Sequence, residues 1–138
     1  MKQCVILFFV IMMGCKPEAS QYVNFIEGYW EIERVTKDDR TIKEFKISTG
    51  IDYFKINNNL SGYRKKLKPN FQGTFETSED ALSFQVKIEH NTLYLEYNDN
   101  ATTYSEEIIK ANASVLVIAN AEGFVYYYKP YESLNLNE

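Results

Sequence analysis

The clearest pattern along the chain lies at 81–89, where apolar and polar residues alternate strictly from Leu82 to Glu89. A period of two places one face of a β-strand in a core and the other in water, and a helix cannot use such a pattern. His90-Asn91 then supplies residues typical of a tight turn, and the alternation resumes over 93–97. These two runs predict a β-hairpin.

The rest of the chain shows the same period in shorter runs, separated by polar turn residues. No run of ten residues carries a convincing apolar stripe at helical spacing, which argues against a parallel fold of alternating strands and helices. Segment 36–46 is ambiguous and could be a strand or a single helical turn. Besides the hairpin, the expected strands lie at 26–33, 52–56, 60–67, 73–76, 103–109, 115–119 and 124–131.

Many short strands that follow one another in hairpins are typical of a barrel or a sandwich. A barrel removes the exposed strand edges that promote aggregation. We therefore predict an all-β fold, a small antiparallel up-and-down β-barrel, with a β-sandwich as the alternative. The 138 residues leave room for one domain, which we place at residues 25–138.

The first 14 residues are typical of a secretory signal. Lys2 precedes nine apolar residues at 5–13, and Gly14 precedes Cys15. The apolar run is shorter than the roughly 20 residues that span a bilayer. The Gly14-Cys15 ending resembles the lipobox of bacterial lipoproteins, where the cysteine becomes lipidated and N-terminal. An ordinary secretion signal with an incidental cysteine is the alternative.

The lipobox resemblance implies an organisation and a location. Residues 1–14 would be the signal peptide, Cys15 the lipidated residue and residues 15–24 a short lipidated tether. The protein would then be an outer-membrane lipoprotein of a Gram-negative cell envelope. Its first partner would be the membrane itself, on the periplasmic or the surface side.

The charge and the residue composition exclude several classes of function. Cleavage after residue 14 removes only Lys2 of the 15 basic residues, so 14 basic residues oppose 19 acidic ones and the net charge is −5. This acidity argues against a nucleic-acid partner. Cys4 and Cys15 are the two cysteines, so the domain would hold no thiol for a disulfide, catalysis or a metal. With His90 as the single histidine, we expect no catalytic residue, no metal, no cofactor and no enzyme.

Gly28-Tyr29-Trp30, on the first expected strand, resembles the GxW signature of lipocalins and smaller lipocalin-like barrels. The layout of the chain as a whole is similar to that of small bacterial lipocalin-like lipoproteins. The resemblance implies that Trp30 plugs one end of the barrel, that Gly28 lets neighbouring backbone approach, and that a late cation covers the indole. Lys129 is the nearest such cation. A core tryptophan in an unrelated β domain is the alternative.

A lipocalin-like barrel also implies a binding module for a small apolar or amphipathic ligand. Tyrosines that line a cavity can hold an apolar body and fix a polar end, although they also simply pack a barrel wall. The competing interpretation is a filled barrel that contacts another envelope protein through exposed Tyr29, Tyr94 and Tyr127. The candidate ligand-binding or barrel-lining residues are Trp30, Phe84, Tyr97, Tyr126 and Tyr128.

Charged clusters support weaker hypotheses. The basic run 64–68 could attract an anionic headgroup, although a solvated strand is the more ordinary interpretation. Glu31 and Glu33 share a strand face that we place outside the barrel. Glu106 and Glu107 are adjacent, so a regular strand points them to opposite faces and they cannot act together.

Overall fold

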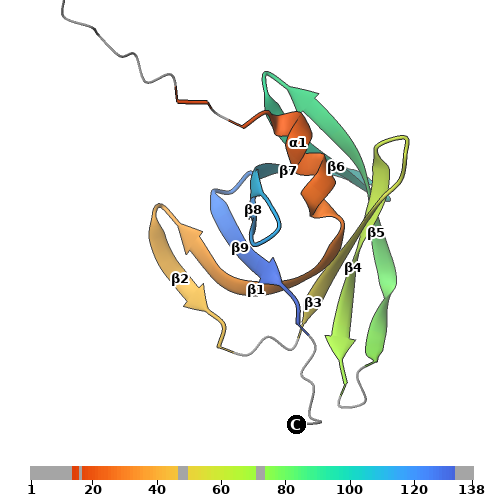
Figure 1. Ribbon diagram of the computed structural model, residues 1–138. Coiled ribbons are helices and arrows are strands. Elements are labelled where there is room, and N and C mark those ends of the chain that lie inside the picture. Colours follow the sequence, from red (N-terminus) through yellow and green to blue (C-terminus); the bar gives the residue numbers. More distant parts are fainter. Residues whose placement is uncertain (1–13, 16, 47–49, 71–73, 133–138) are drawn as a thin grey trace, which may run out of the picture.

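The computed structural model describes residues 14–15, 17–46, 50–70 and 74–132, and these form one short helix and nine strands (Figure 1). All neighbouring strands are antiparallel and belong to one sheet. In the described residues, no helix is long and apolar enough to cross a membrane. In chain order the elements are α1 (Ala19–Ile26), β1 (Gly28–Lys37), β2 (Arg40–Glu44), β3 (Ile51–Ile56), β4 (Ser61–Pro69), β5 (Phe75–Glu89), β6 (Thr92–Asp99), β7 (Thr102–Ala111), β8 (Leu116–Ala119) and β9 (Phe124–Pro130).

The sheet closes on itself because its first and last strands pair. β1 bonds to β3 through residues 28–31 and to β9 through residues 30–37. The eight strands β1 and β3–β9 therefore form a closed antiparallel barrel in which β3 to β9 follow chain order. The predicted barrel is confirmed, rather than the sandwich.

Strand β2 lies outside this closed ring. It pairs with residues 34–37 of β1, and its five residues are all exposed, so it extends from the barrel wall (Figure 1). Asp38 and Asp39 form the turn between β1 and β2 with positive φ angles of 51° and 60°. The ambiguous segment is thus a hairpin with a short tight turn, not a helical turn.

The predicted hairpin is confirmed, and its first strand is longer than expected. β5 and β6 pair from Phe84↔Tyr97 to Glu89↔Thr92. His90 and Asn91 take positive φ values of 50° and 56° at the turn, which matches the twist of two-residue hairpin loops. The runs at 73–76 and 81–89, expected as separate strands, belong to one strand from residue 75.

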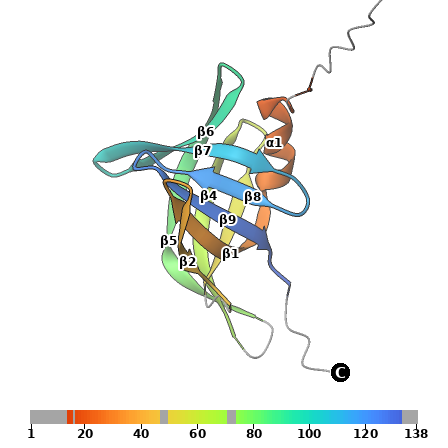
Figure 2. The same ribbon diagram turned by 90° about the vertical axis from the view of Figure 1, so that its left-hand side faces the viewer.

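Helix α1 lies across one end of the barrel (Figures 1 and 2). We expected residues 15–24 to form a tether, whereas the structure is helical from residue 19. Ala19 and Ile26 are buried in the core, and Tyr22 and Val23 pack against it. These four residues have the spacing of one helix face, but the stripe is only two turns long, which is why it escaped the sequence analysis.

Two contacts hold α1 at this end. The backbone N–H of Ala19 donates to Asn91 Oδ1 at 2.9 Å, so the β5–β6 turn binds the start of the helix. The Trp30 indole Nε1–H donates to the Ile26 carbonyl at 2.8 Å. A buried indole N–H needs such a partner, so the tryptophan joins β1 to the end of the helix.

The core next to α1 is densely filled by aromatic side chains. The ring centroids of Phe54 and Phe84 lie 6.4 Å apart, and those of Phe84 and Tyr97 lie 5.7 Å apart in an edge-on arrangement. Gly62 is buried beneath them. A Cβ at this position would lie 2.7 Å from Phe84 Cζ and would also clash with the Lys55 carbonyl. The glycine is therefore what allows β4 to pass the aromatic core.

Candidate functional site

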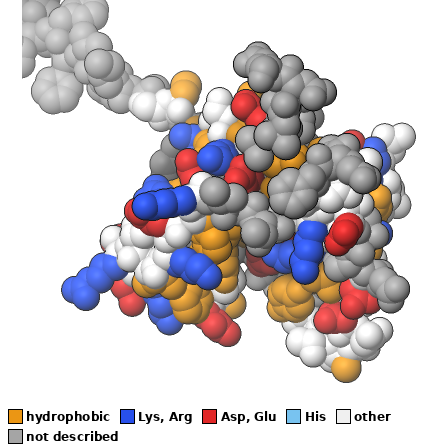
Figure 3. Space-filling view, turned by 90° about the horizontal axis from the view of Figure 1, so that it is seen from below, with side chains coloured by type: hydrophobic (Ala, Val, Ile, Leu, Met, Phe, Trp, Pro, Cys, Tyr) orange, Lys and Arg blue, Asp and Glu red, His pale blue; other side chains and the backbone are white. Residues whose placement is uncertain are grey.

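The barrel contains a partly open cavity of about 450 Å³. This volume lies within the range of roughly 300–1,000 Å³ that is usual for small-molecule sites. Residues of β1, β4, β5, β7 and β9 and of the β8–β9 turn line it. Viewed from below, which is the side away from α1 in Figure 1, the surface is notched between two lobes (Figure 3).

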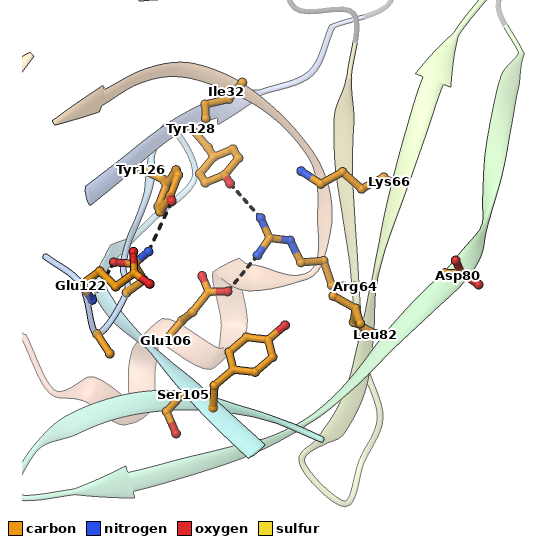
Figure 4. Close-up of a pocket in the computed structure, with 13 residues that line it drawn as sticks. Ile32, Arg64, Lys66, Asp80, Leu82, Ser105, Glu106, Glu122, Tyr126 and Tyr128 are labelled. Atoms are coloured by element: carbon orange, nitrogen blue, oxygen red, sulfur yellow. Dashed lines mark hydrogen bonds and ion pairs between the residues drawn. The ribbon is translucent and has the colours of Figure 1, made fainter. Parts of the chain in front are cut away.

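Arg64 forms the polar floor of the cavity (Figure 4). Its Nη2 donates to Asp52 Oδ2 and to the Tyr128 hydroxyl, both at 2.8 Å, and its Nη1 donates to Glu106 Oε1 at 3.1 Å. The Arg64 side chain is only 12% exposed. Alternation along β4 explains its direction, since Arg64 lies two residues after buried Gly62 and points into the barrel with it.

Asp52 is the most buried carboxylate of this network, with a side chain 4% exposed. Its second oxygen, Oδ1, forms an ion pair with Lys66 Nζ at 3.0 Å. Burial opposes ionisation of Asp52, but the charges of Arg64 and Lys66 outweigh burial and hold the pKa of Asp52 below its usual value. Asp52 therefore carries its negative charge inside the barrel at neutral pH.

Glu106 has the opposite balance. Burial raises the pKa of Glu106 above its usual value, and the nearby Arg64 charge offsets only part of that effect. The Tyr97 hydroxyl is also buried beside Arg64 and Glu106, and it has no hydrogen-bond partner among the described residues. Burial raises the pKa of Tyr97, so this phenol stays neutral inside the filled core.

Tyrosine rings form much of the cavity wall. Tyr104, Tyr126 and Tyr128 line it, and Tyr104 stacks on the buried Tyr97 ring at a centroid distance of 5.0 Å. Asn120 Nδ2 donates to the Tyr126 hydroxyl at 3.4 Å. The wall therefore combines flat apolar surfaces with hydroxyl groups. Ile32 and Leu82 add aliphatic surface, and the exposed carboxylates Asp80 and Glu122 also line the cavity.

The structure divides the predicted lining residues into two groups. Tyr126 and Tyr128 line the cavity. Trp30, Phe84 and Tyr97 instead belong to the filled core, with exposed fractions of 4%, 4% and 0%. The barrel is therefore filled at the α1 end and hollow elsewhere, which combines features of both interpretations of its interior.

The predicted barrel-end group is arranged differently from the expectation. Lys129 pairs with Glu31 across the β1–β9 ladder, one position from Trp30, so its side chain leaves the opposite face of the sheet. Helix α1, not a late cation, covers Trp30. Gly28 has open space around its Cβ position, and its φ of +135° is what requires glycine at the helix-to-strand junction.

The residues of the cavity floor were not predicted from the sequence. Arg64 was interpreted as part of a solvated basic run, Glu106 was considered only as one of an adjacent pair with Glu107, and Asp52 was not singled out. The usable signal was the position of Glu106 in the alternation of inward and outward residues. Glu106 pairs with buried Leu95, whereas Glu107 pairs with Tyr94 on the other face of the sheet. A charged residue in phase with apolar inward residues indicates a polar group inside a barrel.

The N-terminal predictions are largely outside the described residues. The signal peptide, residues 1–14, is described only at Gly14. Cys15 is exposed, with a free thiol, four positions before the start of α1. The anchor therefore stays a prediction.

Comparison with known proteins places the fold in a family. The model of the lipocalin-like domain family matches residues 26–118, which is more than half of the chain. No curated protein matches the chain, and no solved structure does so. The match begins at the end of α1 and extends to β8.

Proposed function

We propose, on the premise that this chain belongs to the lipocalin-like domain family, that its barrel binds one small amphipathic molecule. The observation that carries the proposal is the partly open cavity of about 450 Å³, which ends on the buried Arg64 network. The apolar body of the ligand would lie against the tyrosine wall. Its polar end would lie at the floor, beside Arg64 and Glu106.

The floor is suited to recognition because its polar groups are already held in place. Arg64 bonds to partners on three other strands, β3, β7 and β9. A ligand that meets fixed polar groups does not have to order them on binding, so less free energy is lost on association. The filled core behind the floor adds rigidity, since it leaves these side chains little space to move. No catalytic step is part of this proposal.

Native mass spectrometry of the full chain, released from a bacterial envelope with mild detergent, tests the proposal. We expect an adduct on the order of a few hundred daltons, the size of ligand that such pockets enclose, which is lost on denaturation. The Ala121→Trp variant places a bulky ring on an exposed turn residue that lines the cavity, and it should reduce the adduct. Ala101→Trp, in an exposed turn outside the lining, is the matched control. A clean mass for the unaltered chain would contradict the proposal.

We also propose that Cys15 is lipidated and anchors the protein in the outer membrane. Cys15 is exposed four positions before α1, α1 lies across one end of the barrel (Figure 1), and the cavity lining includes no residue of α1. An anchor there would place the α1 end of the barrel next to the membrane. Replacing Cys15 by Ser should move the protein from the membrane fraction to the soluble fraction, and unchanged fractionation would contradict the anchor.

An aromatic cluster on the outside of the barrel favours a second candidate function, contact with another envelope protein. Tyr29 is 43% exposed, and its ring stacks on Phe75 at a centroid distance of 5.2 Å. The ring centroid of Tyr53 lies 4.6 Å from that of Tyr29, and the ring centroid of Tyr131 lies 5.6 Å from that of Phe75. Exposed tyrosines are enriched at interfaces. Tyr29→Ser should abolish co-purification of a partner while thermal unfolding stays unchanged. Ile88→Ser, at a residue that is 42% exposed and outside the cluster, is the matched control, and equal co-purification from both variants would count against this candidate.

A further inference from the structure

The charges around the cavity are unequal, and we infer that its ligand is a small organic cation, a protonated amine that carries an apolar body. This inference rests on the proposed ligand-binding function and specifies its ligand class. It depends on three features: the balance of charge around the cavity, the pairing of both basic side chains with carboxylates of the protein, and the aromatic wall.

The balance of charge is negative. Two basic side chains line the cavity, Arg64 and Lys66, against three acidic ones, Asp80, Glu106 and Glu122. Asp52 lies directly behind Arg64 and adds a fourth carboxylate. With two positive and four negative groups, the site attracts cations. Partial burial strengthens this attraction, because charges at the floor are less screened than charges in water.

The charges of both basic groups are already paired with carboxylates, and the remaining Arg64 donor, Nε–H, is buried without a hydrogen-bond partner among the described residues. Arg64 donates to Asp52, Glu106 and the Tyr128 hydroxyl. Lys66 pairs with the other oxygen of Asp52. A carboxylate or phosphate ligand would have to separate Arg64 from a buried carboxylate, and that carboxylate would then be left without its counter-charge. The floor is therefore a poor site for an anion.

The Glu106 carboxylate, in contrast, keeps capacity for a donor. Glu106 binds Arg64 through Oε1, and its other oxygen has no hydrogen-bond partner among the described residues. An ammonium group carries up to three N–H donors and no acceptor, so it complements this carboxylate oxygen in the cavity lining.

The tyrosine wall and the exposed carboxylates of the cavity also favour an ammonium ligand. Asp80 and Glu122 are exposed, come from β5 and the β8–β9 turn, and form no ion pair with any described residue. They would attract a cation during its approach. The rings of Tyr104, Tyr126 and Tyr128 offer π faces, which attract ammonium groups within about 6 Å.

Isothermal titration of the full chain in mild detergent tests the inference with three probes of matched size. The probes are 2-phenylethylammonium, the neutral 2-phenylethanol and the anionic 3-phenylpropanoate. We expect the ammonium to bind at least about tenfold more tightly than the alcohol, and the carboxylate to bind most weakly. Equal or tighter binding of the alcohol or the carboxylate would leave ligand binding in place and overturn the cation inference.

Charge-neutralising variants test which carboxylates bind the ammonium group. Glu106→Gln should weaken ammonium binding about tenfold and leave 2-phenylethanol unchanged, because it removes a charge at nearly constant shape. Glu107→Gln makes the same change on the outer face and should change neither affinity. Glu122→Gln, on an exposed turn, should also weaken the ammonium and avoids the buried network.

The outcomes separate this inference from the proposed function. Equal effects of the changes at Glu106 and Glu107 would overturn the assignment of the ammonium to the cavity floor. Failure of all three probes to bind would overturn the inference for amines of this size. The proposed function would then depend on the adduct found in the envelope-derived protein, which the Ala121→Trp variant tests independently.

Discussion

Replacing Arg64 by Met removes the charge that compensates two carboxylates inside the barrel. Asp52 and Glu106 have side chains 4% and 12% exposed, and each bonds to Arg64, at 2.8 Å and 3.1 Å respectively. Methionine keeps most of the length and apolar stem of arginine but offers no donor. The variant therefore leaves two buried carboxylates without their guanidinium partner.

The expected loss of unfolding free energy at pH 7 is ~3–5 kcal/mol, the usual cost of removing one partner from a buried ion pair. Lys66 still pairs with Asp52 at 3.0 Å, but its side chain is 69% exposed. Solvent screens such a pair, so its remaining contribution is ~1 kcal/mol or less. The loss therefore stays large despite Lys66.

The effect should depend on pH with a definite sign. In the unaltered protein the pKa of Asp52 lies below the ordinary 3.8. Ionised Asp52 therefore stabilises the folded state above that value, and this contribution is lost as the pH falls through the folded-state pKa. Without Arg64, burial dominates and raises the pKa of Asp52, so the variant recovers stability as the carboxyl group takes up a proton. The stability difference between the two proteins should shrink from pH 7 towards pH 4.

Urea denaturation followed by Trp30 fluorescence at several pH values measures this difference. The double variant Arg64→Met/Asp52→Asn is the control, because it removes one stranded charge and should regain ~2 kcal/mol or more at pH 7. A loss below ~1 kcal/mol at pH 7, or a loss that does not change with pH, would refute the argument that these carboxylates are buried and held by Arg64.

Three further substitutions test the fold around the cavity by urea denaturation. Gly62→Ala should cost ~1–3 kcal/mol, because its Cβ would clash with the Lys55 backbone carbonyl and would lie 2.7 Å from Phe84 Cζ. Gly28→Ala should cost ~1–3 kcal/mol, because φ is +135° there. Trp30→Phe should cost ~1–3 kcal/mol, since it leaves the buried Ile26 carbonyl without its donor; hydrogen exchange should then accelerate in α1 before the strands.

A matched control distinguishes these effects from a general cost of replacing glycine. Gly50 has open space around its Cβ position and no positive φ, so Gly50→Ala should leave stability within ~0.5 kcal/mol. If it destabilises as much as Gly62→Ala, close packing against the Lys55 carbonyl and Phe84 is not the reason for the glycine at 62. Unchanged exchange in α1 of the Trp30 variant would likewise show that the indole does not hold the helix.

The alternation of residues by itself determined most of the barrel. Inward and outward directions repeat every two residues along a strand, so a local pattern was enough to place Phe84 and Tyr97 inside. The hairpin at 90–91 was equally predictable, because its turn geometry depends on the local residues. Segment 36–46 was left open between a strand and a helical turn, because its exposed strand carries no alternation of burial.

Only the tertiary structure decided what the inward polar residues do. Arg64 is 12 residues from Asp52, 42 from Glu106 and 64 from Tyr128 along the chain, and closure of the barrel brings them together. A period-two pattern states that Arg64 points inward, but it contains no information on which strands face it across the interior. The charge network was therefore not predictable from local sequence.

The helix and the cavity depended on the same long-range packing. The apolar face of α1 spans two turns, too short for a stable isolated helix, and it forms against the core and Asn91. Whether the interior of the barrel is filled depends on the combined size and packing of the inward side chains from all eight strands. Helix α1 and the aromatic core fill one part of that interior and leave the cavity above Arg64, because barrel closure and packing, rather than the pattern of any single strand, set the space that remains.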